Sequence, residues 1–114
     1  YREVTVEYEA AGGRTLCQTV LGWSLGGCQT VWSEVLPRAV AANEQRLRGR
    51  RVLELGAGCG LLGLVAAHAA SAVTLTDGDA EEVALLAVNC QRHAPVDCRV
   101  RAAHLDWGEA AALA

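Results

Sequence analysis

The chain has 114 residues, of which 52% are hydrophobic and 20% are charged. This length and apolar content suit one compact domain and exclude a mainly disordered chain. Ten basic and thirteen acidic residues give a formal net charge of -3, which argues against a surface built to hold nucleic acid.

The five cysteines are odd in number and include no C-x-x-C pair, so we expect neither a disulfide framework nor a metal site. A reducing compartment fits this pattern, and we expect the cytoplasm or the nucleus. No apolar run reaches the length of a membrane span, and the first residues do not resemble a signal peptide, so we expect no membrane partner. Methionine is absent even at position 1, which we interpret as a sign that the sequence is a piece of a longer protein.

The first part of the chain has the pattern of a β-hairpin followed by a loop and a helix. Polar and apolar residues alternate over 2–8, and a second β-rich run covers 14–20. Glycines at 22, 26 and 27 predict a loop. Apolar residues then recur at helical spacing over 33–46, where Ser33 is the expected N-cap and Pro37 falls near the first turn.

The rest of the chain alternates strands and helices. Short apolar runs predict strands over 52–55, 72–76 and 98–103. Between them, an alanine- and leucine-rich run predicts a helix over 61–70, and a helix over 79–93 has acidic residues at its start and basic ones at its end. This order predicts an α/β protein with a parallel sheet and right-handed crossovers.

The segment Glu54-Leu-Gly56-Ala-Gly58-Cys-Gly60 lies where the first buried strand meets the next helix. Three glycines let a backbone pass close to a ligand, and the helix N-terminus offers free N–H groups, so a nucleotide-like ligand is expected here. A tight turn without a ligand is the alternative. A dinucleotide fingerprint that starts at Gly56 would need glycine where Leu61 stands. Glu54 would be a costly buried charge unless it faced a cation or a donor.

These residues resemble the class I, seven-strand S-adenosylmethionine-dependent methyltransferases, whose first motif is acid-x-Gly-x-Gly-x-Gly. The resemblance implies S-adenosyl-L-methionine as cofactor and assigns Glu54, Gly56, Gly58 and Gly60 to its methionine part. Asp77, at the end of the next predicted strand, would accept hydrogen bonds from the ribose hydroxyls. The alternative for Asp77 is to cap the following helix, a role that Asp79 fills equally well.

The segment from about 21 to 108 resembles more closely the lysine methyltransferase-like subgroup called methyltransferase family sixteen. Shared features are a loop leading to a tryptophan, here Trp32, the strand and glycine loop above, an asparagine near Asn89, and Leu105-Asp106-Trp107-Gly108. The resemblance implies that Trp32 lies over the cofactor and that Asp106 and Trp107 border the adenine. Each tryptophan could equally belong to the core.

The resemblance implies a Rossmann-like three-layer αβα methyltransferase fold, of which this chain would hold the first half of the sheet. We expect an N-terminal β-hairpin and glycine loop over 1–30 and a partial S-adenosylmethionine-binding domain over 31–114. In this piece the first core strand would have an unpaired edge.

The implied function is S-adenosylmethionine-dependent methyl transfer to a protein substrate, with lysine as the expected acceptor. We expect a monomer, with a chaperone-type protein as one potential substrate or partner. The Asp-x-x-Tyr-type motif of the substrate channel does not occur before Ala114, so no catalytic residue is named. The alternatives are a non-catalytic interaction module and another nucleotide-binding α/β protein.

Overall fold

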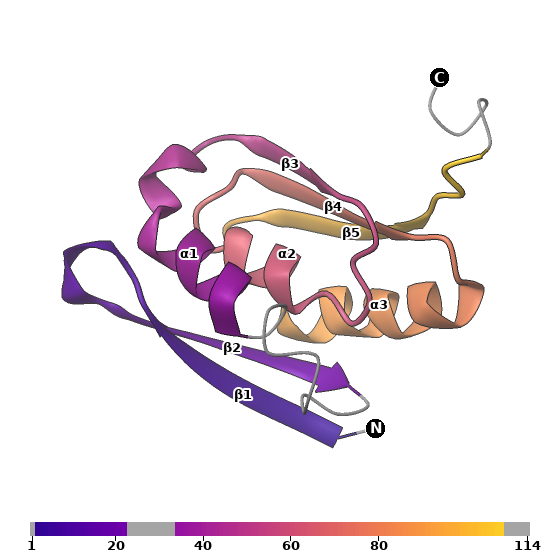
Figure 1. Cartoon of the computed structure of the whole chain (residues 1–114), viewed down its shortest axis with the longest axis horizontal. Coiled ribbons are helices and arrows are strands. Elements are labelled where there is room, and N and C mark those ends of the chain that lie inside the picture. The colour runs from indigo at the N-terminus through magenta and orange to yellow at the C-terminus, as the bar shows by residue number, and fades with distance from the viewer. Residues whose placement is uncertain (1, 23–33, 109–114) are drawn as a thin grey trace.

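The computed structural model describes residues 2–22 and 34–108. Figure 1 shows a parallel sheet, a layer of helices beneath it, and an antiparallel hairpin on the far side of the helices. The expectations for Ser33, for Trp32 and for the glycines at 26 and 27 lie outside the described residues.

The hairpin consists of β1 (Arg2–Glu9) and β2 (Thr15–Gly22), joined by the short 3-10 turn η1 (Ala11–Gly13). Both glycines of the turn have positive φ angles, which glycine adopts without steric cost. Alternate residues of β2 are buried against the helices, as a half-buried strand requires. The predicted hairpin is therefore confirmed.

The first helix is shorter than the sequence pattern predicts. The α-helix α1 (Leu36–Ala42) is followed by the 3-10 turn η4 (Glu44–Arg46), so the expected α-helix over 33–46 is wrong after Ala42. The reason is Asn43, whose side-chain amide donates to the carbonyl of Ala39 at 2.8 Å. Asparagine competes with the helix ladder in this way and favours helix ends. Pro37 lies in the first turn, where its missing N–H is tolerated.

The sheet contains β3 (Arg51–Glu54), β4 (Ala72–Asp77) and β5 (Arg99–His104), all parallel and in the order β3-β4-β5. This confirms the α/β class and the parallel sheet. Glu54 pairs with Leu75, and Asp77 pairs with His104, so the strands end at one common edge.

Two helices connect these strands. The helix α2 (Leu61–Ala66) is shorter than the expected 61–70, because the chain turns after it to enter β4, with the N–H of Ser71 bonded to the carbonyl of Arg50. The helix α3 (Ala80–His93) matches its expected range. Asp79 is its N-cap and accepts a hydrogen bond from the N–H of Glu81 at 2.9 Å.

The buried apolar residues form two clusters, one on each side of the helix layer. One lies between the hairpin and the helices, and the other lies between the helices and the sheet. The first contains Tyr8, Ala10, Leu16, Val20, Ala41, Leu61, Leu64 and Val65. The second contains Ala67, Ala70, Val73, Leu75, Leu86 and Cys90. The helices α1 and α2 contribute to the first cluster, and α3 contributes Leu86 and Cys90 to the second.

The helices α2 and α3 cover one face of the sheet (Figure 1), whereas α1 packs on α2 and β1. Among the described strands β3 pairs only with β4, which is the unpaired edge that the sequence predicts. Leu53 and Leu55 are 59% and 53% exposed at this edge. Within residues 2–22 and 34–108, no helix has the length and apolarity needed to cross a membrane.

Candidate functional site

The loop after β3 is fastened to the end of β4. The N–H of Ala57 donates to the carbonyl of Thr76 at 2.8 Å, and the hydroxyl of Thr76 donates to the carbonyl of Glu54 at 2.7 Å. These bonds continue the parallel pairing past the last residue of β3. The loop is therefore fixed at the carboxyl edge of the sheet, where open α/β sheets bind their ligands.

Asp77 ends β4 and holds the glycine loop directly. Its Oδ2 accepts a hydrogen bond from the N–H of Gly58 at 3.1 Å, and its Oδ1 accepts one from the N–H of Asp79 at 3.0 Å. A carboxylate has about four lone-pair sites, so two remain after these bonds. Because Asp79 caps α3 itself, the capping alternative for Asp77 is not needed.

The three motif glycines differ in what surrounds them. Gly56 and Gly58 have φ angles of 66° and 59°; a Cβ at Gly58 would meet nothing within 4 Å, and one at Gly56 would meet only the Trp107 ring, at 3.8 Å. Gly60 has a φ of 95°, and a Cβ there would lie 2.7 Å from Leu86. Gly56 and Gly58 thus leave an open backbone surface, whereas Gly60 is required by the core beneath it.

Glu54 places a carboxylate below this surface. One of its oxygens, Oε1, is buried with no hydrogen-bond partner among the described residues, and a Cβ at Gly63 would lie 2.7 Å from it. Burial raises the pKa of the Glu54 carboxyl from 4.5 to about 7, and the N–H of Gly63 offsets part of this effect. A cation or a donor near this group would therefore stabilise its charged form.

The segment after β5 brings Trp107 to the same edge. The N–H of Leu105 donates to the carbonyl of Asp77 at 3.0 Å and anchors the segment. Trp107 is 66% exposed and lies beside Gly56. Asp106 is exposed and accepts a hydrogen bond from the N–H of Gly108 at 3.0 Å. The structure thus brings Glu54, the glycine loop, Asp77, Asp106 and Trp107 to one edge, and Trp32 lies outside the described residues.

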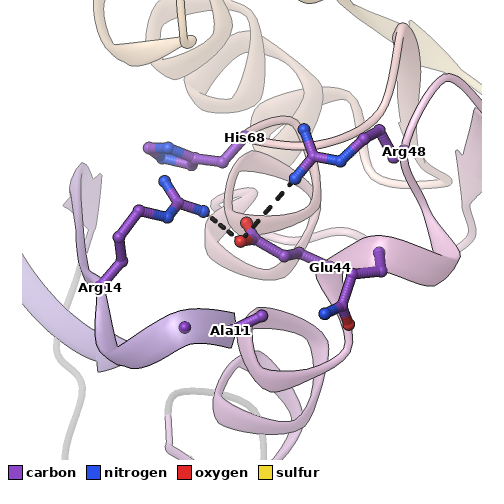
Figure 2. A pocket seen from close by; sticks show the side chains of 7 residues that line it. Ala11, Arg14, Glu44, Arg48 and His68 are labelled. Atoms are coloured by element: carbon purple, nitrogen blue, oxygen red, sulfur yellow. Dashed lines mark hydrogen bonds and ion pairs between the residues drawn. The ribbon is translucent and has the colours of Figure 1, made fainter.

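A cavity of about 370 Å³ lies elsewhere, between the hairpin turn and η4 (Figure 2). Glu44, 5% exposed at its side chain, forms ion pairs with Arg14 and, at 3.9 Å, with Arg48. His68 also lines the cavity and shares a 2.7 Å hydrogen bond with Gln18. This cluster carries no residue of the glycine loop and fastens the hairpin to the helices.

The comparison with known proteins bears on this site directly. A family model described as lysine methyltransferase matches residues 20–113, which include the glycine loop, Asp77 and Trp107. The chain belongs to the lysine methyltransferase family. The match begins within β2, so the end of the hairpin is part of the family domain.

Members of the lysine methyltransferase family with curated names resemble the chain at similar identity. The calmodulin-lysine N-methyltransferase of Arabidopsis thaliana is 37% identical over 72% of this chain and 28% of its own length. The protein N-lysine methyltransferase METTL21A of Danio rerio is 37% identical over 75% of this chain and 40% of its own length. The EEF1A lysine methyltransferase 3 of Mus musculus is 37% identical over 76% of this chain and 38% of its own length. The matched region of this chain therefore spans less than half the length of each relative.

Two residues at this edge of the sheet have roles that the sequence analysis did not predict. Gly63 lies against both Leu75 and the carboxylate of Glu54, so it makes room for the buried acid. Asn89 is completely buried in α3 and bonds to the carbonyl of Cys59 inside the glycine loop. The signal for Asn89 is an amide among the apolar residues Leu85, Leu86 and Cys90 on the buried side of α3, since buried polar groups require partners.

Proposed function

We propose that this chain binds S-adenosyl-L-methionine at the carboxyl edge of its sheet, as part of an enzyme that methylates lysine in a protein substrate. The observation that carries the proposal is the position of Asp77. Its carboxylate holds the glycine loop and retains lone pairs for two further hydrogen bonds. A ribose offers two adjacent hydroxyl donors that suit such a group.

The residues at this edge fit the remaining parts of the cofactor. The unpartnered oxygen of Glu54 suits an ammonium group, reached directly or through the loop. Gly56 and Gly58 leave the backbone surface clear, as close approach by a ligand requires. Trp107 and Asp106 are exposed beside the loop, where they can border the adenine. Gly60 supports the loop from below.

S-adenosyl-L-methionine supplies a methyl group on a sulfonium, which an amine takes by direct displacement. The task of the protein is then alignment, which can supply roughly 7 to 11 kcal/mol of the barrier. A lysine amine with a pKa near 10.4 must also lose its proton, at a cost of about 4 kcal/mol near neutral pH. The names of the relatives, which include a calmodulin-lysine and a protein N-lysine methyltransferase, support lysine as the acceptor.

Titration calorimetry with S-adenosyl-L-methionine tests the cofactor assignment. We expect Asp77→Asn to weaken binding by about ten-fold or more, because a hydrogen bond to a charged group contributes about 1.5 to 3 kcal/mol. Asp79→Asn is the matched control, since asparagine caps a helix as well as aspartate does. Equal affinities of the wild type and Asp77→Asn would remove the ribose assignment, and no binding by the wild type would refute the proposal.

Methyl transfer itself needs a second assay. Cell lysate incubated with the protein and a radiolabelled methyl donor should gain label in protein bands, and Gly58→Arg should abolish this gain by filling the open surface of the loop. Label on lysine after hydrolysis would support the acceptor. Cofactor binding without any transfer would favour a non-catalytic module.

A further inference from the structure

Asn89 is a buried amide that uses three of its four hydrogen-bonding positions. The residue is 0% exposed, in a helix whose inner side is otherwise apolar. Its Nδ2 donates to the carbonyls of Leu21 and Cys59, both at 2.8 Å. Its Oδ1 accepts from the N–H of Leu21 at 2.7 Å. These three bonds satisfy the amide in a fully buried position, as buried polar groups require.

These bonds join two segments that are distant in sequence. Leu21 is the second-last residue of β2, and Cys59 stands between two glycines of the loop. A separate observation agrees, because a Cβ at Gly22 would lie 3.8 Å from the sulfur of Cys59. The end of the hairpin and the underside of the glycine loop are therefore in contact, and Asn89 bonds to both.

The loop is consequently held from two directions. Asp77 fixes the N–H of Gly58 from the sheet edge, and Asn89 fixes the carbonyl of Cys59 from the helix layer. The peptide between Cys59 and Gly60 is bonded at both ends, since the N–H of Gly60 donates to the carbonyl of Ala57 at 2.9 Å. The direction of the loop N–H groups thus depends on Asn89, although Asn89 itself lies beneath the loop.

We infer that Asn89 is a positioning residue for the cofactor, which locks the glycine loop to the end of β2. This inference rests on the proposed function for its cofactor. Only an amide can accept from the N–H of Leu21 and also donate to two carbonyls. An aspartate would turn a carboxylate oxygen toward carbonyl oxygens, so it cannot replace the asparagine.

Gln18 provides a matched control. It is also a buried amide, 3% exposed, and it also makes three hydrogen bonds, to the carbonyls of Thr19 and His93 and to the ring of His68. It fastens the same strand β2 to the helices but has no bond to the glycine loop. Loss of either amide should therefore destabilise the hairpin, while only Asn89 should affect the loop.

The test compares Asn89→Ala with Gln18→Ala by urea unfolding and by calorimetric titration with S-adenosyl-L-methionine. We expect similar losses of stability, with at least a ten-fold weaker affinity for Asn89→Ala and a change below about two-fold for Gln18→Ala. Asn89→Asp should weaken binding as much as Asn89→Ala. Equal losses of affinity in the Asn89 and Gln18 variants, or an unchanged affinity in Asn89→Ala, would overturn the inference.

Hydrogen exchange gives a readout that needs no ligand. In Asn89→Ala, the amides of Gly58 and Gly60 should exchange at least ten-fold faster relative to the amide of Ala10, which is bonded at the hairpin turn. If the wild type does not bind the cofactor, the proposed function fails while this measurement still decides the role of Asn89. Should Asn89→Ala not fold, Asn89→Ser, which is neutral and retains a hydroxyl for one hydrogen bond, is measured in the same way. Equal acceleration at all three amides would refute the inference.

Discussion

Asp77 accepts a hydrogen bond from the backbone N–H of Gly58 at 3.1 Å, so the residue that ends β4 also holds the loop that follows β3. The parallel register makes this contact possible, because it places the ends of both strands at one edge. The shape of the glycine loop therefore depends on the neighbouring strand as well as on its own glycines. This arrangement leads to separable effects on stability and binding.

Gly58 and Gly60 should respond differently to alanine. At Gly60 the positive φ would strain an alanine, and the added Cβ would lie 2.7 Å from Leu86 and overpack the core. Gly60→Ala should therefore lower the unfolding free energy by about 2 to 4 kcal/mol. Gly58→Ala adds only the conformational strain, about 1 to 2 kcal/mol, but its methyl group enters the open surface. Urea unfolding and cofactor titration of both variants test this. A larger loss of stability in Gly58→Ala would contradict it.

Glu54 should make stability depend on pH. Because burial raises the pKa of its carboxyl to about 7, the folded state binds its proton more tightly than the unfolded chain does. The contribution of Glu54 to stability should fall as pH rises from about 4.5 to about 7, by at most about 1.4 kcal/mol per pH unit. Glu54→Gln stays neutral and should lack this decline.

The measurement is urea unfolding of the wild type and Glu54→Gln at several pH values across that range. The difference between the two unfolding free energies isolates Glu54 from other titrating groups, such as His68. Glu9→Gln, on the exposed side of the hairpin, controls for the loss of one charge. If the difference in unfolding free energy between the wild type and Glu54→Gln stays constant with pH, Glu54 is not a buried acid with a raised pKa.

Trp107 should matter for binding much more than for folding. Its ring is 66% exposed, so Trp107→Ala should change the unfolding free energy by no more than about 0.5 kcal/mol. Loss of stacking on a base costs about 1 to 3 kcal/mol, which predicts at least a five-fold weaker affinity for S-adenosyl-L-methionine. Trp107→Phe retains an aromatic face and should recover part of the loss. An affinity unaffected by the alanine would place the ring outside the adenine site.

Arg14 should stabilise the hairpin more than Arg48 does. Both guanidinium groups pair with the buried carboxylate of Glu44, but Arg48 only at 3.9 Å (Figure 2). Arg14→Ala would leave that carboxylate with only the weaker partner, Arg48, and should lower the unfolding free energy by about 1 to 2 kcal/mol. This loss is smaller than that for a fully buried ion pair, because the Arg14 side chain is half-exposed. Arg48→Ala should cost under about 0.5 kcal/mol. Urea unfolding of both variants checks the order, and a reversed order would contradict it.

Much of the fold was predictable because local patterns agree with the tertiary structure. The hairpin, the three parallel strands and α3 follow from periodicity and from the charges at the helix ends. Helix ends without a strong breaker were not predictable. α1 ends where Asn43 bonds back to Ala39, and α2 ends where the chain must turn into β4. Neither helix end is marked by a glycine or a proline in the sequence.

The residues of the candidate site that belong to a sequence motif were predictable. The residues of other elements that pack beneath the glycine loop were less predictable. The motif indicates the acid, the glycines and Asp77, and the structure brings them to one edge. It does not distinguish the open Gly58 from the packed Gly60, because that difference depends on Leu86 in α3. It likewise does not show which segments Asn89 joins, because one of them is the end of the hairpin.

The helix α2 contributes to the apolar cluster under the hairpin through Leu61, Leu64 and Val65, and its Gly63 touches Leu75 in the cluster under the sheet. Neither cluster can be hydrated without disturbing this helix. Heating should therefore melt the hairpin and the sheet in one cooperative transition, with the same midpoint in near-ultraviolet and far-ultraviolet circular dichroism. Unfolding of either the hairpin or the sheet would expose α2 to water, and the remaining layer would then lose the helix on which it packs.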